Sequence, residues 1–225
     1  MSAPPAVLHT YWRSSCSYRV RIVLAAKGIP YASAPVHLVR DGGQQHGAPY
    51  AALNPSHKVP TLQIDGLTLV QSAAIAEYLE ETRPEPALLP RDAAARARVR
   101  ALCCVISNDI QPLGNLATLQ HVAAISVPAD APPEARAAAR DAWARHWLAL
   151  GFAALEALMA PRAGRFCEGD AFSLADAFLA PQGYNAARVG LDMAPYPTIR
   201  GVLERLEQHP WVAAAHPAAQ PDAEK

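Results

Sequence analysis

The chain has 225 residues, and its 20 Lys and Arg balance its 20 Asp and Glu, so a nucleic acid or a membrane surface is not expected as its main partner. Apolar residues make up 51% of the chain, enough for a sizeable core, yet no apolar run reaches the roughly 18 residues that cross a bilayer. The four cysteines have neither the density of a disulfide scaffold nor the spacing of zinc ligands, and the first residues lack the features of a secretory signal, so we expect a cytoplasmic protein with reduced thiols and no metal.

The first elements are predicted to be a strand, a hydroxyl-rich turn and a helix. A short apolar run over residues 7–12 leads into an amphipathic segment that Gly28 ends. Ser14 and Ser15 fall at the start of this helix, where backbone N–H groups lack intrahelical partners and the helix dipole is positive. The pattern therefore predicts an anion site at the turn. The alternative is that both serines are ordinary helix caps.

The following segments predict the rest of a mixed sheet. Residues 31–38 are expected to form a second strand, residues 40–45 a loop and residues 48–53 a helical turn. Two β-prone runs, residues 59–64 and 67–70, flank the dipeptide Asp65-Gly66, which is typical of a tight hairpin. A helix follows, and Ser72 is well placed to cap it. The order βαβ and then ββα predicts a four-stranded mixed sheet covered by helices.

Beyond this sheet the pattern is helical. Three prolines in residues 84–90 indicate a linker, so we expect an α/β domain over residues 1–83 and an all-α domain over residues 91–225. Helices are predicted over residues 94–110, 134–159 and 199–206, and another after the capping box Ser173-Leu174-Ala175-Asp176. An apolar stripe on the longest helix is interpreted as core or dimer surface, and the tail from Ala218 is expected to fray. The stripe consists of Trp143, Trp147, Leu150, Ala154 and Leu158.

Four motifs in this order resemble the glutathione transferase superfamily, and the resemblance covers nearly the whole chain. They are Ser14-Ser15-Cys16-Ser17-x-Arg19-Val20-Arg21, Asp41-Gly42-Gly43-Gln44-Gln45, Asn54-Pro55-x-x-x-Val59-Pro60-Thr61-Leu62 with Gln71-Ser72-x-Ala74-Ile75, and Asn108-Asp109-Ile110-Gln111-Pro112-Leu113-x-Asn115. The first and last are similar to those of the zeta class, which includes maleylacetoacetate isomerase. The resemblance implies the glutathione transferase fold, with a thioredoxin-like N-terminal domain and an all-α C-terminal domain, and it implies a homodimer.

The resemblance implies glutathione as the cofactor and the first motif as its catalytic turn. Ser14 would donate a hydrogen bond to the glutathione thiolate. Lowering the thiol pKa by about two units takes about 2.7 kcal/mol. One hydrogen bond to a charged group (about 1.5–3 kcal/mol) and a helix dipole (about 0.3–1 kcal/mol) suffice. Ser15 is the alternative donor, and Cys16 would assist, form a mixed disulfide with glutathione or have no role.

Other residues that match the family would bind the glutathione backbone. A cis Pro60 would turn the Val59 N–H and C=O towards the cysteinyl residue, as an added strand would; the alternative is a trans proline on an edge strand. Ser72, at its helix start, would bind the γ-glutamyl carboxylate, with Gln71 beside it. Gln45 would reach the glycyl end.

The implied second substrate is a small cis-diacid. The thiolate would add to the double bond of maleylacetoacetate, the new single bond would rotate, and expulsion of the thiolate would give the fumaryl product. Two carboxylates call for fixed cations, and Arg13 and Arg188 match, although an exposed arginine is often only solvated. Gln111 and Asn115 would contact glutathione or substrate, or only cap the chain around Pro112.

Three alternatives to this function stay open. The same chemistry on maleylpyruvate, the shorter analogue of gentisate breakdown, would use the same turn. A conjugating or dehalogenating transferase acting on 2-halo acids would use the same thiolate. The non-enzymatic alternative is a glutathione-binding stress protein, which would be favoured if Ser14 or Ser72 were absent; both are present.

Overall fold

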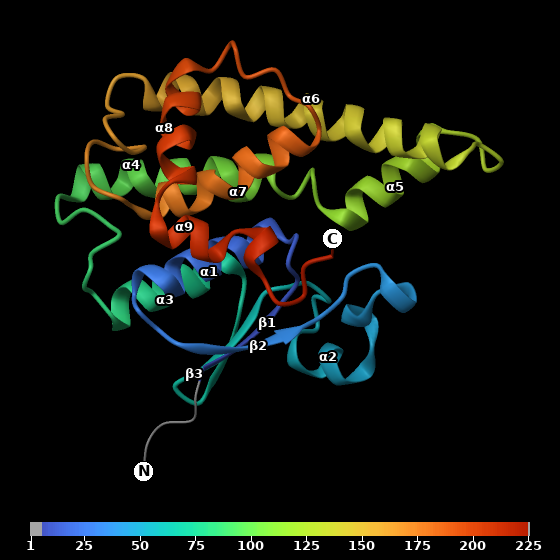
Figure 1. Cartoon of the computed structure of the whole chain (residues 1–225), viewed down its shortest axis with the longest axis horizontal. Coiled ribbons are helices and arrows are strands. Elements are labelled where there is room, and N and C mark those ends of the chain that lie inside the picture. The colour runs from blue at the N-terminus through green and yellow to red at the C-terminus, as the bar shows by residue number, and fades with distance from the viewer. Residues whose placement is uncertain (1–5, 225) are drawn as a thin grey trace. The chain divides into compact units, whose positions relative to one another are not determined.

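The computed structural model describes residues 6–224, which form two compact units (Figure 1). The first unit contains the described residues up to Leu88 together with those from Gln208 onwards, and the second unit is Leu89–Glu207. The expected helical domain ran from residue 91 to the C-terminus, whereas the structure groups the last segment with the sheet. The interpretation of the N-terminal residues as lacking a secretory signal concerns residues 1–5, which lie outside the described residues.

The first unit is built on a four-stranded mixed sheet with the strand order β2-β1-β3-β4. β1 (Ala6–Thr10) pairs in parallel with β2 (Tyr31–Pro35) and antiparallel with β3 (Thr61–Ile64). β3 forms a hairpin with β4 (Leu67–Val70) through Asp65 and Gly66. Both turn residues have positive φ, as a type I′ turn requires. The predicted sheet and hairpin are therefore confirmed.

Helices cover both faces of this sheet. α1 (Ser15–Ala26) packs against α3 (Ser72–Thr82) on one face, as Figure 1 shows. α2 (Ala48–Leu53) follows the short turns η1 (Arg40–Gly42) and η2 (Gln44–His46) and lies on the other face, where the ring of Tyr50 is 5.9 Å from that of His9. The face of β1 that carries Leu8 is fully buried.

The C-terminal segment docks on α1, and the tail from Ala218, which was expected to fray, is also held: Asp222 Oδ2 accepts the Trp12 N–H at 2.9 Å, so that expectation is wrong. α9 (Pro210–Ala215) and η4 (Pro217–Ala219) continue the chain, and α9 packs on α1. The hydroxyl of Tyr18 donates to the carbonyl of Val212 at 3.2 Å, and Nε of Arg21 donates to the carbonyl of Ala215 at 3.0 Å. These partners are backbone carbonyls, which carry no signature in the local sequence of the tail.

The second unit is helical. Its elements are α4 (Ala93–Cys104), the π-helical η3 (Val105–Ile110), α5 (Leu116–Ser126), α6 (Pro133–Met159), α7 (Leu174–Arg188) and α8 (Pro197–Glu207). The break at Pro112 and the capping box of Ser173 and Asp176 are as predicted. α6 approaches η3 so closely that a Cβ on Gly151 would lie 2.2 Å from the Ile110 side chain. Among the described helices, none combines the length and hydropathy that crossing a bilayer requires.

The apolar stripe of α6 is only partly core. Trp143 is half-buried and its Nε1 donates to the carbonyl of Leu113 at 2.9 Å. Leu150 and Leu158 are 52% and 50% exposed. The interpretation as core is wrong for these two leucines, and the interpretation as a dimer surface stays a prediction.

Candidate functional site

The predicted site residues of the first unit share one edge of the sheet. β2 runs parallel to β1, and β4 also runs parallel to β1 because each is antiparallel to β3. The segments after β2, β1 and β4 therefore begin at the same edge at which the segment before β3 ends. They carry Gln45, Ser14, Ser72 and Val59–Pro60 respectively. Open α/β sheets bind ligands at the carboxyl ends of their strands, and this edge has that property for three strands.

The turn after β1 presents hydrogen-bond donors. Ser14 is the N-cap of α1, with φ −68° and ψ 119°, and its Oγ accepts the N–H of Ser17 at 3.1 Å. Because a hydroxyl is both donor and acceptor, this cap leaves the hydroxyl hydrogen available for a ligand. The N–H groups of Ser15 and Cys16 have no partner among residues 6–224. All three side chains are half-buried, so the turn can receive an anion.

A buried arginine, Arg21, donates hydrogen bonds to the residues that lead into this turn. Arg21 donates from Nη2 to the Trp12 carbonyl at 3.0 Å and from Nη1 to the Tyr11 carbonyl at 3.4 Å and Thr10 Oγ1 at 3.2 Å. Burial lowers the pKa of the guanidinium to about 10, so it stays charged at neutral pH. Sequence reasoning assigned Arg21 no role. The available signal was its place in the sequence of the predicted helix, between the apolar residues Val20 and Ile22.

The second segment of the edge is the loop before β3. The peptide bond between Val59 and Pro60 is cis, as expected. In the part of the chain that the structure describes, neither the N–H nor the C=O of Val59 has a hydrogen-bond partner. The loop is held by buried Asn54, whose Nδ2 donates to the Lys58 carbonyl at 2.7 Å and to Thr61 Oγ1 at 3.2 Å. A fixed loop whose Val59 N–H and C=O have no hydrogen-bond partner is suited to bind a peptide-like ligand.

The third segment is Gln71–Ser72, at the start of α3. Gln71 is exposed and has φ 70°, a conformation that costs a non-glycine residue about 1–3 kcal/mol and is concentrated at ligand sites. The expectation that Ser72 caps α3 is wrong: it is the first helical residue, and no side-chain cap is present. Its buried Oγ instead accepts from Nη1 of Arg19 at 3.3 Å. Arg19, which had no assigned role, thus joins α1 to the start of α3.

Gln45 is engaged within its own loop. Its side chain is buried, and Nε2 donates to the Leu38 carbonyl at 3.2 Å. It packs beneath Gly43, where an added Cβ would lie 2.5 Å from Gln45 Nε2 and where φ is +100°. The neighbouring Gln44 accepts the His37 N–H at 2.8 Å. In this structure the loop amides therefore brace the segment after β2.

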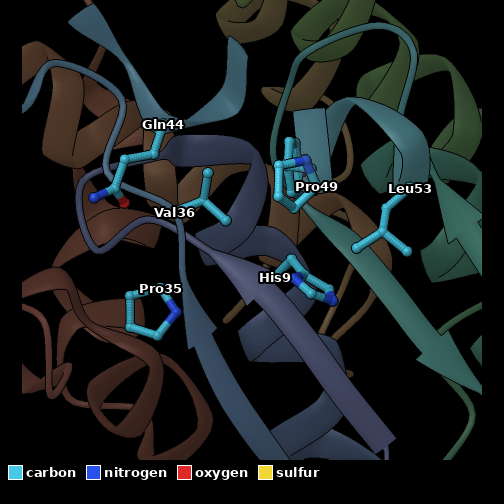
Figure 2. A pocket seen from close by; sticks show the side chains of 7 residues that line it. His9, Pro35, Val36, Gln44, Pro49 and Leu53 are labelled. Carbon is cyan, nitrogen blue, oxygen red and sulfur yellow. The ribbon is translucent and has the colours of Figure 1, made fainter. Parts of the chain in front are cut away.

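A shallow pocket of about 250 Å³ lies elsewhere on the first unit (Figure 2). Figure 2 shows His9 of β1 facing Pro49 and Leu53 of α2, so the pocket is on the α2 side of the sheet. None of the predicted site residues lines it. Its lining is His9, Pro35, Val36, Gln44, Pro49, Tyr50 and Leu53. This pocket is distinct from the edge that carries Ser14.

The remaining predicted residues differ in their surroundings. Arg13 is exposed beside Ser14, and its guanidinium lies 5.5 Å from the centre of the Trp12 ring. The others belong to the second unit: Gln111 is half-buried after η3, Asn115 caps α5, and Arg188 is exposed as the last residue of α7. Asn115 Oδ1 accepts the Ala117 N–H at 3.1 Å, so its capping role is present whether or not it also contacts a ligand.

The other thiols belong to the second unit. Cys103 and Cys167 are buried and Cys104 is exposed, and none of the three forms a disulfide among the described residues. Burial and the adjacent Asp176 raise the pKa of the Cys167 thiol. Asp176 accepts the Cys167 N–H at 2.8 Å and, in the capping box of α7, the N–H of the N-cap Ser173 at 2.8 Å, so its role is structural. No group of three or more His, Cys, Asp or Glu within residues 6–224 is arranged to hold a metal ion.

The sheet edge, the cis Pro60 and the serine at the start of α1 define a glutathione S-transferase. Residues 13–82 match the family described as glutathione S-transferase, N-terminal domain. The chain is 46% identical over 222 residues to the maleylacetoacetate isomerase of Rattus norvegicus, covering 99% of this chain and 97% of that protein. At such identity over the full length, the chain belongs to the zeta-class maleylacetoacetate isomerase family.

Solved structures agree with this assignment. A maleyl pyruvate isomerase, described as a bacterial glutathione S-transferase in the zeta class, has a TM-score of 0.89 and 41% identity, covering 97% of this chain and 100% of that one. A maleylacetoacetate isomerase from Anaeromyxobacter dehalogenans 2CP-1, with GSH bound in its active site, has a TM-score of 0.84 and 46% identity, with 98% of each chain covered. The predicted family and fold are therefore confirmed.

Proposed function

We propose that this protein is a glutathione-dependent cis–trans isomerase that converts maleylacetoacetate to fumarylacetoacetate. The observation that carries the proposal is the Ser14 hydroxyl, which caps α1 by accepting the Ser17 N–H and keeps its hydrogen available at the sheet edge. The family to which the chain belongs supports the choice of substrate, because its full-length relative from Rattus norvegicus is a maleylacetoacetate isomerase.

Glutathione would lie along the sheet edge in the order of the strands. The unpaired N–H and C=O of Val59 would bind its cysteinyl backbone as an added strand does. Ser72 and Gln71, at the start of α3, would bind the γ-glutamyl carboxylate. The glycyl end would then fall on the side of β2, where Gln45 lies. This order places the thiol next to β1, where Ser14 follows.

The reaction would then follow from a stabilised thiolate. Its electron pair forms a C–S bond with one alkene carbon of the cis-enedione, and the π electrons move to the conjugated carbonyl oxygen as an enolate. The former double bond is now single and rotates. Collapse of the enolate re-forms the double bond as trans and expels the thiolate, so glutathione is regenerated. Ser14 would donate a hydrogen bond to the thiolate before it attacks and again after it is expelled. Ser15 and Cys16 lie beside Ser14.

The carboxylates of the substrate would be bound by arginine. Arg13 is exposed next to Ser14, where a guanidinium can pair with a carboxylate. Arg188 is exposed at the end of α7, and Gln111 and Asn115 are polar residues of the same unit. We propose these residues as the substrate-binding set on their match to the family motifs.

Maleylpyruvate is the rival substrate, and a structural relative with that activity favours it: the neighbour with a TM-score of 0.89 is a maleyl pyruvate isomerase. The two substrates share the cis double bond that the thiolate attacks and differ in the length of the chain beyond it. The catalytic turn would therefore serve either one, and the residues that contact the rest of the substrate would select between them.

One experiment tests the function and the substrate together. The protein is incubated with maleylacetoacetate and, separately, with maleylpyruvate, with and without glutathione, and the loss of the cis substrate is followed by ultraviolet absorbance. We expect a glutathione-dependent acceleration with the higher kcat/KM on maleylacetoacetate. A higher value on maleylpyruvate would reassign the substrate, and no acceleration of either would overturn the isomerase proposal.

We further propose a cytoplasmic homodimer. The half-exposed Leu150 and Leu158 of α6, and Ile125 of α5 at 70% exposure, support an assembly that covers apolar surface in the second unit. Sedimentation of the purified protein tests the dimer, and a species of 24.0 kDa at all concentrations would refute it.

A further inference from the structure

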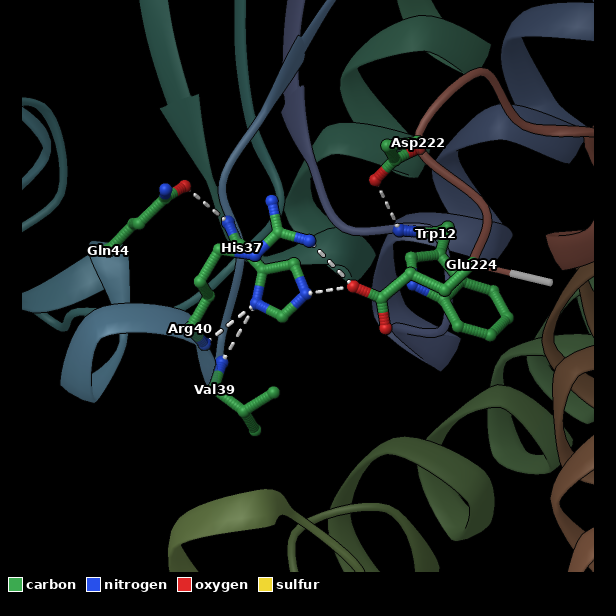
Figure 3. A network of polar contacts seen from close by, with 7 residues as sticks. All are labelled: Trp12, His37, Val39, Arg40, Gln44, Asp222 and Glu224. Atoms are coloured by element: carbon green, nitrogen blue, oxygen red, sulfur yellow. Dashed lines mark hydrogen bonds and ion pairs between the residues drawn. The ribbon is translucent and has the colours of Figure 1, made fainter.

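The last described residues form a strap across the segments that follow β1 and β2 (Figure 3). Asp222 Oδ2 accepts the Trp12 N–H at 2.9 Å. Two residues later, Glu224 Oε1 lies 2.9 Å from Nε2 of His37 and 2.9 Å from Nη2 of Arg40. Between them, Ala223 packs against a cluster of buried side chains. That cluster is Tyr11, Trp12, Val36, Tyr50 and Val59.

The strap acts on the residue that leads into the catalytic turn. Trp12 is followed by Arg13 and Ser14, and its peptide groups are held on two sides. Its N–H donates to Asp222 and its carbonyl accepts from Arg21 at 3.0 Å. The Trp12 residue is only 9% exposed, so loss of the acceptor would leave its N–H with little access to water.

We propose that Asp222 is a positioning residue that fixes where the Ser14 hydroxyl points. The proposal rests on the proposed function for its kinetic reading, because it concerns the same thiolate. Without the Asp222 acceptor, the peptide that joins Tyr11 and Trp12 keeps only the bonds at its carbonyl, from the Ser14 N–H and Arg21 Nη1, and can rotate about them. That rotation moves the turn whose Ser14 N–H is bonded to the Tyr11 carbonyl at 3.0 Å. A small displacement weakens a hydrogen bond to the thiolate more than it weakens the binding of the glutathione backbone at Val59, which is on another loop.

Glu224 serves as the comparison within the same strap. Its side chain is 49% exposed, and exposed ion pairs contribute little. Its hydrogen bonds go to His37 and Arg40 in the segment after β2, whereas the Trp12 N–H is bonded to Asp222. A change at Glu224 therefore removes a tail charge and leaves the Trp12 contact intact.

The test compares Asp222→Ala, Asp222→Asn and Glu224→Gln with the wild-type full-length chain. The pKa of enzyme-bound glutathione is read from the ultraviolet absorbance of the thiolate across pH, alongside glutathione affinity, kcat and thermal stability. For Asp222→Ala we expect the bound thiol pKa to rise by about 0.5–1 unit and kcat to fall about ten-fold, with glutathione affinity within about two-fold. Asp222→Asn keeps an oxygen acceptor and should restore most of both values, and Glu224→Gln should match the wild type.

An unchanged thiol pKa and kcat in Asp222→Ala would overturn the proposal, even if thermal stability falls, because the contact would then be merely structural. Equal losses in Asp222→Asn and Asp222→Ala would also overturn it, since the amide oxygen can still accept the Trp12 N–H. The titration separates this inference from the proposed function: a wild type that ionises bound glutathione but isomerises neither substrate would refute the isomerase alone.

Discussion

Replacing Ser14 by alanine removes two contacts with different consequences. The first is the bond from the Ser17 N–H to Ser14 Oγ at 3.1 Å, which caps α1. The second is the hydrogen bond that the hydroxyl would donate to the glutathione thiolate. The cap is worth about 1 kcal/mol of unfolding free energy. The charged hydrogen bond is worth about 1.5–3 kcal/mol of thiolate stabilisation, which corresponds to about 10- to 150-fold in rate.

We therefore expect Ser14→Ala to lower kcat for maleylacetoacetate by about 10²-fold, with glutathione affinity within a few-fold, because the proposed contacts of Val59 and Ser72 with the peptide would be retained. The assay is steady-state isomerisation, with calorimetry for glutathione and denaturant unfolding for stability. Ser14→Asp separates the two contacts. Its carboxylate still caps the helix, but it repels the thiolate, so stability should be retained while activity is lost.

Ser14→Thr is the matched control, since it retains both the acceptor and the donor. Wild-type activity in Ser14→Ala would refute the reasoning and transfer the donor role to Ser15 or Cys16. A loss of activity in Ser14→Ala that only follows a loss of folded protein would also refute it, because the two contacts would then not be separable.

Three further predictions concern the support of the site and of the fold. Arg21→Met should lower the unfolding free energy by more than about 2 kcal/mol in denaturant unfolding, because several buried carbonyls lose their donor. Exposed Arg162→Met is the control, and equal stability of both variants would contradict this. Asn54→Ala should weaken glutathione binding several-fold in calorimetry through the loop of Val59, and an unchanged affinity would show that the loop needs no such brace. Hydrogen bonds from Arg83 and Tyr78 lower the pKa of Asp65 to about 2, so its stabilising effect is present above pH 4 and is lost as the pH falls towards 2. The stability difference between wild type and Asp65→Asn should shrink over that range, and a pH-independent difference would refute the assignment.

Much of the fold followed from local patterns because the interactions involved are local. The dipeptide Asp65-Gly66 predicts its hairpin since few other residues adopt positive φ at both turn positions. The capping box of Ser173 and Asp176 lies within one helical turn, so its two partners are three residues apart. The family and the cis Pro60 followed from motifs, each of which is short and contiguous.

Contacts between distant segments were not predictable in this way. Ser72 was expected to cap its helix, and the structure turns it to Arg19 of another helix. Leu150 belongs to a regular apolar stripe, but the stripe does not state which part of it another element covers. The expectation at Ser72 was wrong, and at Leu150 only the dimer-surface interpretation remains as a prediction. In both cases a helical period fixes which side chains share a face and leaves open what that face meets.

The sequence alone determined the order of elements, the serine turn at the start of α1 and the family, because each rests on residues close together in the chain. Only the tertiary structure decided that Arg21 and Asp222 hold the Trp12 peptide before that turn. Asp222 is 210 residues away from Trp12, and its partner is a backbone N–H that any residue but proline would supply. A contact of this kind leaves no pattern in the sequence, because the identity of the Trp12 side chain does not determine which acceptor its backbone N–H binds.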